Sequence, residues 1–152
     1  ALPICVFGHG FTYSGHPVAA AAAMANLDII EREDLIGNAA RVGAYFQERL
    51  RAAFSSHRFI GNVRGKGLIA AIELVADPAS KRRFPVARKV GPEIGAESIE
   101  LGLIARPLGG GDILALSPPL TITTAEVDLV VARLHQAVEI VSRRLVEEGA
   151  HL

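Results

Sequence analysis

The chain has 152 residues, half of them hydrophobic, so it is long enough to bury one sizeable core. Sixteen basic residues balance sixteen acidic ones, which argues against binding to nucleic acid or to an acidic membrane surface. No apolar run approaches the ~20 residues of a membrane span, and the single cysteine, Cys5, excludes an internal disulfide and suits a reducing compartment. We therefore expect a cytoplasmic protein whose partners are small molecules or other protein chains.

A loop rich in glycine and hydroxyl side chains, residues 8–17, leads directly into an alanine-rich stretch. Backbone N–H groups, the hydroxyls of Thr12 and Ser14, and the positive end of a following helix all favour an anion such as a phosphate. The same residue types also serve simply to turn a chain, so a plain turn is the alternative. The small side chains of residues 18–30 predict a helix that is buried against neighbours on several sides.

A second helix is predicted after a break at residues 31–34, with Asp34 as its N-cap. Its apolar positions recur at three- and four-residue steps, which is typical of an amphipathic helix with one buried face. These positions are Leu35, Ala39, Val42, Phe46, Leu50 and Phe54. The break is a candidate domain boundary, with residues 1–33 ending a larger domain and residues 34–152 forming a connector helix and a small domain.

From Phe59 onward the hydrophobic period changes from helical to strand-like. Two strands, residues 59–63 and 68–75, predict a β-hairpin whose turn is formed by residues 64–67. Gly102 is placed to end a helix over residues 87–101, and Thr123 has capping-box spacing with Glu126 at the start of a last helix. Two short strands, residues 103–106 and 113–117, lie between these helices. The order β-β-α-β-β-α predicts an α+β domain whose antiparallel or mixed sheet is covered by helices on one face.

Arg106 is the strongest candidate for binding a ligand. It ends the predicted strand 103–106 and precedes a glycine-rich stretch, residues 107–111, so its guanidinium can project into a cleft. A planar guanidinium with several donors suits a carboxylate. The alternative is a surface arginine paired with a nearby acid, and the glycine-rich stretch adds doubt about how far Arg106 reaches.

Other residue types with catalytic potential are poorly placed. Lys66 lies in the predicted hairpin turn, where its ammonium would be solvated, whereas a lysine that forms a Schiff base works best partly desolvated. Lys81 and Lys89 lie in polar stretches. No acid or cysteine accompanies His9 and His16, so we expect no metal site.

The residues 7–17, FGHGFTYSGHP, resemble a segment of the class III aminotransferases, most closely of the omega-amino-acid:pyruvate group. The resemblance implies the fold type I architecture, a pyridoxal 5′-phosphate (PLP) cofactor, and a homodimer with shared active sites. In that family this loop belongs to the large domain, and its threonine and the preceding residue contact the cofactor phosphate of the neighbouring subunit. The implied cofactor-binding residues are Phe11 and Thr12.

Two further segments resemble the same family. The run GLIAR over residues 102–106, followed by SPPL over 117–120, matches the setting of a family arginine that pairs with the substrate carboxylate and swings aside for amines. Arg106 is therefore the implied substrate-binding residue. Residues 63–68 resemble a turn of the family's small domain, which is a second argument against a catalytic role for Lys66. The family's Schiff-base lysine precedes the loop at Gly8, so we expect this chain to be the C-terminal part of such an enzyme and inactive by itself.

The function implied by the resemblance is transfer of an amino group from an amine or omega-amino acid to a 2-oxo acid such as pyruvate. A racemase or aminomutase of the same fold stays open, as do the amine used and the enantiomer made. The rival prediction is a stand-alone α+β module that binds an anion or a partner protein without catalysis.

Overall fold

A computed structural model describes residues 10–148 and divides the chain into two compact units, between Leu35 and Ile36. Each unit is described by itself. Cys5 and His9, which the sequence analysis considered, lie outside the described residues. The assignment of residues 1–33 to a large domain, and of residues 34–152 to a connector helix and small domain, stays a prediction.

The first unit contains the helix α1, Pro17–Arg32, which begins with a proline in its first turn as predicted. The break that follows is also present, because the helix ends at Arg32, the Asp34 N–H donates to the Glu31 carbonyl at 3.1 Å, and Asp34 has a positive φ of 48°. The predicted burial of α1 is wrong for this chain, since none of its residues is buried and Val18 is 71% exposed. Small side chains allow close packing on several sides, but they do not by themselves provide a partner surface.

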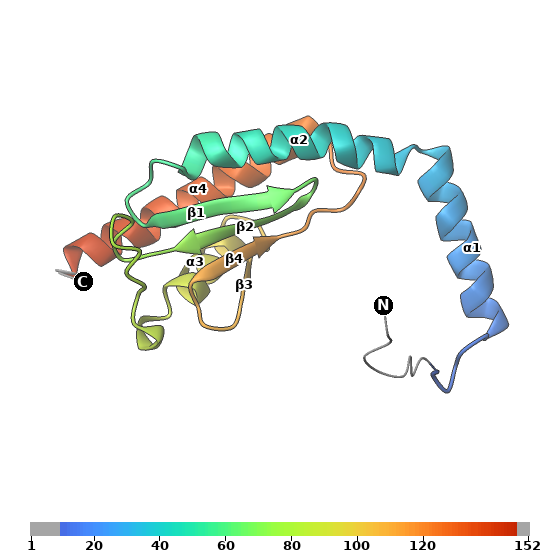
Figure 1. The fold of residues 1–152 in the computed structure, drawn as a ribbon, viewed down its shortest axis with the longest axis horizontal. Helices are drawn as coiled ribbons and strands as arrows, with labels where there is room; N and C mark the ends of the chain where they lie inside the picture. Colours follow the sequence, from blue (N-terminus) through green and yellow to red (C-terminus); the bar gives the residue numbers. More distant parts are fainter. Residues whose placement is uncertain (1–9, 149–152) are drawn as a thin grey trace, which may run out of the picture. The chain divides into compact units, whose positions relative to one another are not determined.

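The second unit has the predicted order of elements (Figure 1). Helix α2, Leu35–Phe54, is followed by strands β1, Ile60–Lys66, and β2, Ile69–Leu74. A short 3₁₀ helix, η1, Val86–Arg88, precedes helix α3, Val90–Glu100, and then strands β3, Arg106–Pro107, and β4, Ile113–Leu116. Helix α4, Thr124–Glu147, ends the unit. None of the helices among residues 10–148 is both long and apolar enough to cross a bilayer.

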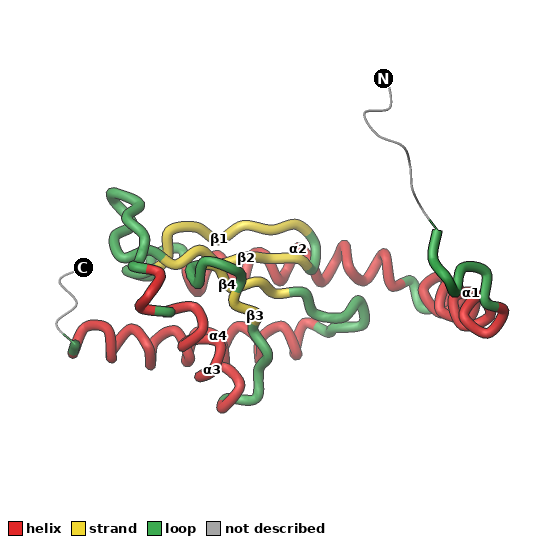
Figure 2. Tube along the Cα trace, turned by 90° about the horizontal axis from the view of Figure 1, so that it is seen from below, coloured by secondary structure: helices red, strands yellow, loops and turns green. Residues whose placement is uncertain are grey.

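The four strands form one antiparallel sheet in the order β1-β2-β4-β3. Alternate residues of β2 and β4 are buried on one face, where Ile72 pairs with Leu114. Helices α3 and α4 lie on the same side of this sheet (Figures 1 and 2). The apolar stripe of α2, including Phe46 and Leu50, belongs to the same core cluster as Ile72. The α+β fold, with its helices over one face of the sheet, is therefore confirmed.

The β1–β2 turn is tighter than predicted. Lys66 pairs with Ile69, so only residues 67–68 connect the strands, and Gly67 supplies the positive φ of 55° that such a turn requires. Gly65 lies inside β1 for a different reason. A Cβ on Gly65 would come within 2.7 Å of the Gln47 amide on α2, so the missing side chain allows the helix to approach the hairpin.

The end of α3 and the start of α4 follow the sequence signals closely, whereas Asp34, the predicted N-cap of α2, has a left-handed φ of 48° in place of the extended backbone typical of an N-cap. Thr123 and Glu126 form the predicted capping box, in which the Thr123 N–H donates to Glu126 Oε2 at 2.8 Å. These hydrogen bonds from Thr123 hold the pKa of Glu126 below its ordinary value. Gly102 ends α3 with a φ of 76°, as expected for a helix stop. The helix begins at Val90 rather than residue 87, because Lys89 adopts a left-handed φ of 52°.

Candidate functional site

Arg106 lies at the wall of a pocket in the second unit. The pocket has a volume of about 560 Å³ and is bounded by the chain before β3, by the segment after β4 and by the start of α4. It is lined by Leu103, Ile104, Arg106, Ala115, Leu116, Ser117, Pro118, Pro119, Thr121, Ile122, Glu126 and Val130. The volume and the mostly apolar lining with a few polar groups are typical of a small-molecule site.

The charge of Arg106 is uncompensated within the described part of the chain. Its guanidinium makes no ion pair or hydrogen bond to any of residues 10–148, so the alternative of a structurally paired surface arginine lacks support. The acid lining the same pocket, Glu126, is already engaged by Thr123 at the helix cap. Arg106 therefore presents unused donors in a pocket that Ser117 and Thr121 also line, and these residue types suit a carboxylate.

Two contacts from outside the pocket position its wall. The Asn38 side-chain amide on α2 donates to the carbonyls of Leu120 and Ile122, at 2.7 and 3.1 Å. Arg133 on α4 donates to the Gly102 carbonyl at 3.0 Å and holds the turn that precedes Leu103. The pocket wall is thus fixed to two helices, although its own segments are irregular.

The strand that carries Arg106 is shorter than predicted. β3 contains only Arg106 and Pro107, whereas residues 103–105 do not pair with another strand. Arg106 therefore begins the strand instead of ending it. The glycine-rich stretch turns back as a hairpin, in which the Leu108 N–H donates to the Ile113 carbonyl at 2.8 Å. Its residues do not line the pocket, so they leave the face of Arg106 open.

Phe11 and Thr12 lie in the first unit, in a turn before α1. The Phe11 N–H donates to Ser14 Oγ at 3.0 Å, and the Ser14 N–H donates back to the Phe11 carbonyl at 2.9 Å. Thr12 is exposed, and its hydroxyl has no partner among the described residues. The structure thus brings Phe11, Thr12 and Ser14 into one exposed turn, whereas Arg106 belongs to the other unit.

The three lysines of the chain are all exposed. Lys66 lies at the end of β1 and not inside the turn, which corrects its predicted place but leaves its side chain in solvent. Lys81 and Lys89 both have positive φ, 57° and 52°, in loops. A desolvated lysine of the kind that forms a Schiff base is therefore not among residues 10–148.

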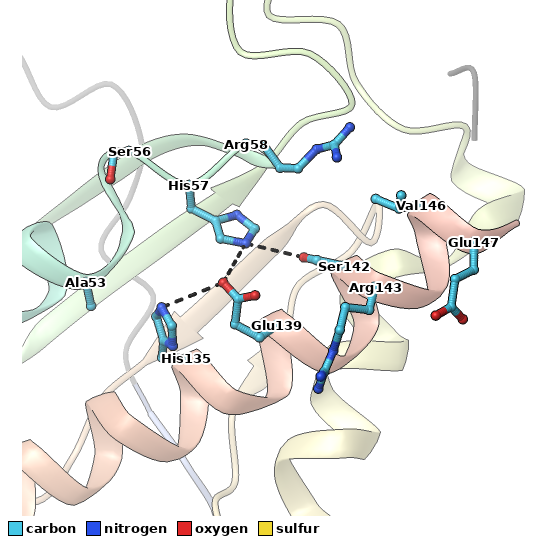
Figure 3. A pocket seen from close by; sticks show the side chains of 10 residues that line it. All are labelled: Ala53, Ser56, His57, Arg58, His135, Glu139, Ser142, Arg143, Val146 and Glu147. Carbon is cyan, nitrogen blue, oxygen red and sulfur yellow. Dashed lines mark hydrogen bonds and ion pairs between the residues drawn. The ribbon is translucent and has the colours of Figure 1, made fainter. Parts of the chain in front are cut away.

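A second pocket, of about 520 Å³, was not anticipated from the sequence (Figure 3). It brings His57, from the loop after α2, against Glu139 and Ser142 of α4, with 3.4 Å from His57 Nε2 to Glu139 Oε1 and to Ser142 Oγ. His135 Nε2 lies 3.8 Å from the same Glu139 oxygen. The spacing of His135 and Glu139, four residues apart on a predicted helix, was the only sequence signal for this cluster.

The hydrogen bonds of His57 define its protonation. The Phe59 N–H donates to His57 Nδ1 at 3.2 Å, so the neutral ring carries its proton on Nε2, toward Glu139. Burial lowers the pKa of His57 below its ordinary value of 6.5, and the nearby Glu139 carboxylate only partly opposes this effect. Protonation of His57 Nδ1 would also place its N–H next to the Phe59 N–H, and the two donors would repel each other.

This arrangement predicts a stability that depends on pH. Because His57 binds a proton less readily when folded, the stability is complete above the unfolded pKa of 6.5 and is lost as the pH falls through the lower folded value. We expect the denaturant midpoint of unfolding to decrease as the pH is lowered from about 6.5 to 5, and His57→Gln to make this decrease smaller. His135→Gln, which changes a half-exposed ring, is the control and should retain most of the slope. Equal slopes in His57→Gln and the unsubstituted protein would contradict the assignment.

Together, the described residues form a small α+β domain in which Arg106, with no ion pair among residues 10–148, lines a mostly apolar pocket. The family comparison specifies this further: the model of the class-III aminotransferases matches residues 2–138, and the chain belongs to that family.

Curated relatives of the chain are transaminases. It is 54% identical to a diaminobutyrate–2-oxoglutarate transaminase of Halomonas elongata over 143 residues, which cover 94% of this chain and 30% of the relative. It is 36% identical to a probable gamma-aminobutyrate transaminase 4 of Oryza sativa subsp. japonica, covering 93% of this chain and 29% of the relative. The chain therefore spans about a third of the length of these relatives.

Solved structures agree with this result. A transaminase from an ancestral-reconstruction study matches with a TM-score of 0.87 at 56% identity, covering 92% of this chain and 31% of that one. An (S)-enantioselective omega-transaminase from Thermomicrobium roseum matches with a TM-score of 0.82 at 44% identity, covering 91% and 30%. The predicted family is confirmed, and membership in it favours an aminotransferase part over a stand-alone binding module.

Proposed function

We propose that the complete protein is a PLP-dependent aminotransferase that moves an amino group from an amine or omega-amino acid to a 2-oxo acid such as pyruvate. Membership in the class-III aminotransferases supports this proposal, as do relatives named for diaminobutyrate, gamma-aminobutyrate and omega-amino substrates. The observation that carries it is Arg106, which lines a mostly apolar pocket and has no ion pair among the described residues. Such a group recognises the carboxylate that amino acids and 2-oxo acids share.

Arg106 would bind and orient the substrate carboxylate through the several N–H donors of its guanidinium. Glu126 would stay out of this contact, because its carboxylate is held at the helix cap by Thr123. Ser117 and Thr121 line the same pocket and would offer hydroxyl donors. These residues position the substrate without themselves transferring a proton.

The turn before α1 has the donor chemistry to hold the phosphate of PLP. The Thr12 hydroxyl is exposed and unused among the described residues, and the turn leads to the N-terminus of a 16-residue helix. The Phe11 N–H, now donating to Ser14 Oγ, can serve the same anion if that contact opens. When bound, PLP supplies an electron sink. The lysine that carries the cofactor would come from outside residues 10–148.

A homodimer with shared active sites is part of the proposal, with Phe11 and Thr12 serving the cofactor of the neighbouring subunit. The exposed apolar surface of α1, which includes Met24 and Leu27 at 59% and 52% exposure, supports a role in association. The cytoplasmic setting rests on the single cysteine, Cys5.

The proposal is tested first with this chain and then with the complete enzyme. Mixing the chain with PLP and reducing with borohydride should give no stoichiometric lysine adduct, with Lys66→Ala as the control for surface labelling. A stoichiometric adduct at Lys66 would mean that the chain has its own catalytic centre. The complete enzyme should transfer an amino group to pyruvate, and its failure with every amine donor and 2-oxo acceptor tried would overturn the proposed activity.

Replacing Thr12 by alanine in the complete enzyme should raise the dissociation constant for PLP about tenfold, the effect of losing one hydrogen bond to a charged group. Equilibrium titration followed by the cofactor absorbance measures this change. Tyr13→Phe is the matched control, since it removes the neighbouring exposed hydroxyl. An equal change in both variants would show that the turn as a whole, and not Thr12, determines the affinity.

A further inference from the structure

We propose that Asp112, through its ion pair with Arg83, is a positioning residue for Arg106 and thereby sets the preference for substrates that carry a carboxylate. This inference rests on the proposed function, because it assigns the device that holds the arginine of that site. Arg106 lies on the short strand β3, and Asp112 lies at the far end of the hairpin loop that follows it.

β3 is weakly held by its own backbone. It has two residues, and one of them, Pro107, has no N–H to donate to β4. The loop that follows contains three consecutive glycines, of which Gly110 and Gly111 have positive φ values of 98° and 76°. Glycines carry the largest conformational entropy of any residue type, so this loop needs external contacts to hold one shape.

Asp112 supplies a side-chain contact of this kind. It is 4% exposed, and one of its carboxylate oxygens, Oδ2, is contacted by both Nε and a terminal nitrogen of Arg83. Its backbone carbonyl accepts from the Leu74 N–H of β2 at 2.7 Å. Asp112 therefore ties the loop to the sheet through its backbone and to the segment before η1 through its carboxylate.

The second carboxylate oxygen of Asp112, Oδ1, is buried and has no partner among the described residues. Because the Arg83 side chain is 64% exposed, its ion pair with Asp112 adds little net stability, whereas removal of Arg83 would leave the buried Asp112 carboxylate without its partner. The pair is therefore better explained by the geometry that it fixes than by the stability that it adds.

A close backbone contact fixes the same loop from the other side. The Gly91 N–H at the start of α3 donates to the Gly111 carbonyl at 2.8 Å. A Cβ on Gly91 would lie 2.3 Å from that carbonyl oxygen, so no larger residue fits while the loop keeps this place. Gly109, in contrast, has no atom within 4 Å of an added Cβ. The loop is thus clamped at residues 111–112 and open at residue 109.

A movement of residues 111–112 would shift Arg106, because both belong to the same β-hairpin. Arg106 pairs with Ala115 and Pro107 pairs with Leu114, so the position of β3 depends on the connection between them. If the ion pair between Asp112 and Arg83 is lost, the glycine loop can adopt other conformations. The guanidinium of Arg106 then no longer has a fixed direction. Binding of a carboxylate then requires the loop to be ordered again, which weakens that binding alone.

The test uses the complete, PLP-loaded enzyme and compares pyruvate with propanal, an acceptor of similar size that has no carboxylate. In Asp112→Asn and in Arg83→Gln we expect the KM for pyruvate to rise about tenfold, the size of one partly lost charge-assisted contact. The kcat for pyruvate and the KM for propanal should stay within about twofold. Arg83→Lys should restore part of the affinity, and Gly109→Ala should leave both acceptors unchanged.

A double-mutant cycle separates positioning from a general structural effect. If Asp112 acts through Arg106, Asp112→Asn should change nothing further for pyruvate in an Arg106→Leu background. Equal losses for both acceptors, or additive losses in the cycle, would overturn the inference. Because Arg83 is 64% exposed on its side chain, Arg83→Gln gives a folded variant even if Asp112→Asn does not. An unsubstituted enzyme without amino transfer would instead mean that the proposed function is wrong.

Discussion

Replacing Arg106 by leucine in the complete enzyme is expected to lower kcat/KM for a 2-oxo acid by about 100-fold, the size of one lost hydrogen-bonded contact between charged groups. The leucine preserves apolar packing in the pocket and removes the donors. Reaction with a carboxylate-free acceptor should be retained, because Arg106 would contact the part of the substrate that this acceptor lacks. Steady-state kinetics with pyruvate and propanal measure both effects.

The matched control for this prediction is Arg143→Leu. It removes the same charge from α4, where Arg143 lines the pocket around His57 and does not line the pocket around Arg106. We expect Arg143→Leu to leave the ratio of the two acceptors unchanged. If the two substitutions lower activity with pyruvate equally, the effect comes from the net charge and Arg106 is not the carboxylate partner.

Replacing Phe46 by alanine should lower the free energy of unfolding by about 3–5 kcal/mol, the range for a large aromatic removed from a core. Phe46 lies on α2, is 0% exposed, and belongs to the cluster that joins this helix to Ile72 and Leu114 of the sheet. The loss of stability has two parts. The transfer free energy of the buried phenyl ring is lost, and a cavity remains because the surrounding helix and sheet cannot move far enough to fill it. Denaturant unfolding measures it as a shift of the midpoint.

Ile36→Ala on the same helix is the control, because Ile36 is 73% exposed and its truncation should change the unfolding free energy by no more than about 0.5 kcal/mol. Both changes place alanine in α2, so helix propensity works in the same direction in each. A loss below about 1 kcal/mol for Phe46→Ala would mean that α2 does not seal the core in solution.

The parts of the fold that follow local rules could be predicted from the sequence. The stripe on α2 and the capping box of α4 depend on neighbours within a few residues, and both are present. The place of Gly65 inside β1 could not be predicted, because an added Cβ would meet the Ile69 carbonyl of the paired strand at 2.3 Å and the Gln47 amide of α2 at 2.7 Å. The two-residue length of β3 likewise depends on its pairing with Ala115 and Leu114.

The residues of the candidate site also fall into those that the local sequence identifies and those that it does not. Arg106 was identified from its local run of residues and from the proline-rich segment that follows. The residues of α4 that complete its pocket were not identified. Asp112 and Arg83 are far apart in sequence, and nothing near either residue indicates the other. His57 and Glu139 are separated by most of the second unit. Clusters of this kind become visible only when packing brings distant residues together.

The strand order β1-β2-β4-β3 also has a consequence for synthesis on the ribosome. The β1–β2 hairpin is local and can form as soon as Leu74 has emerged, but the other edge of β2 pairs only with β4. Until residues 113–116 are made, the nascent chain carries an open strand edge with Ile72 and Leu74 beside it. Such an edge can pair with the wrong chain. Slow translation between residues 75 and 112 would prolong that exposure and lower the yield of folded protein.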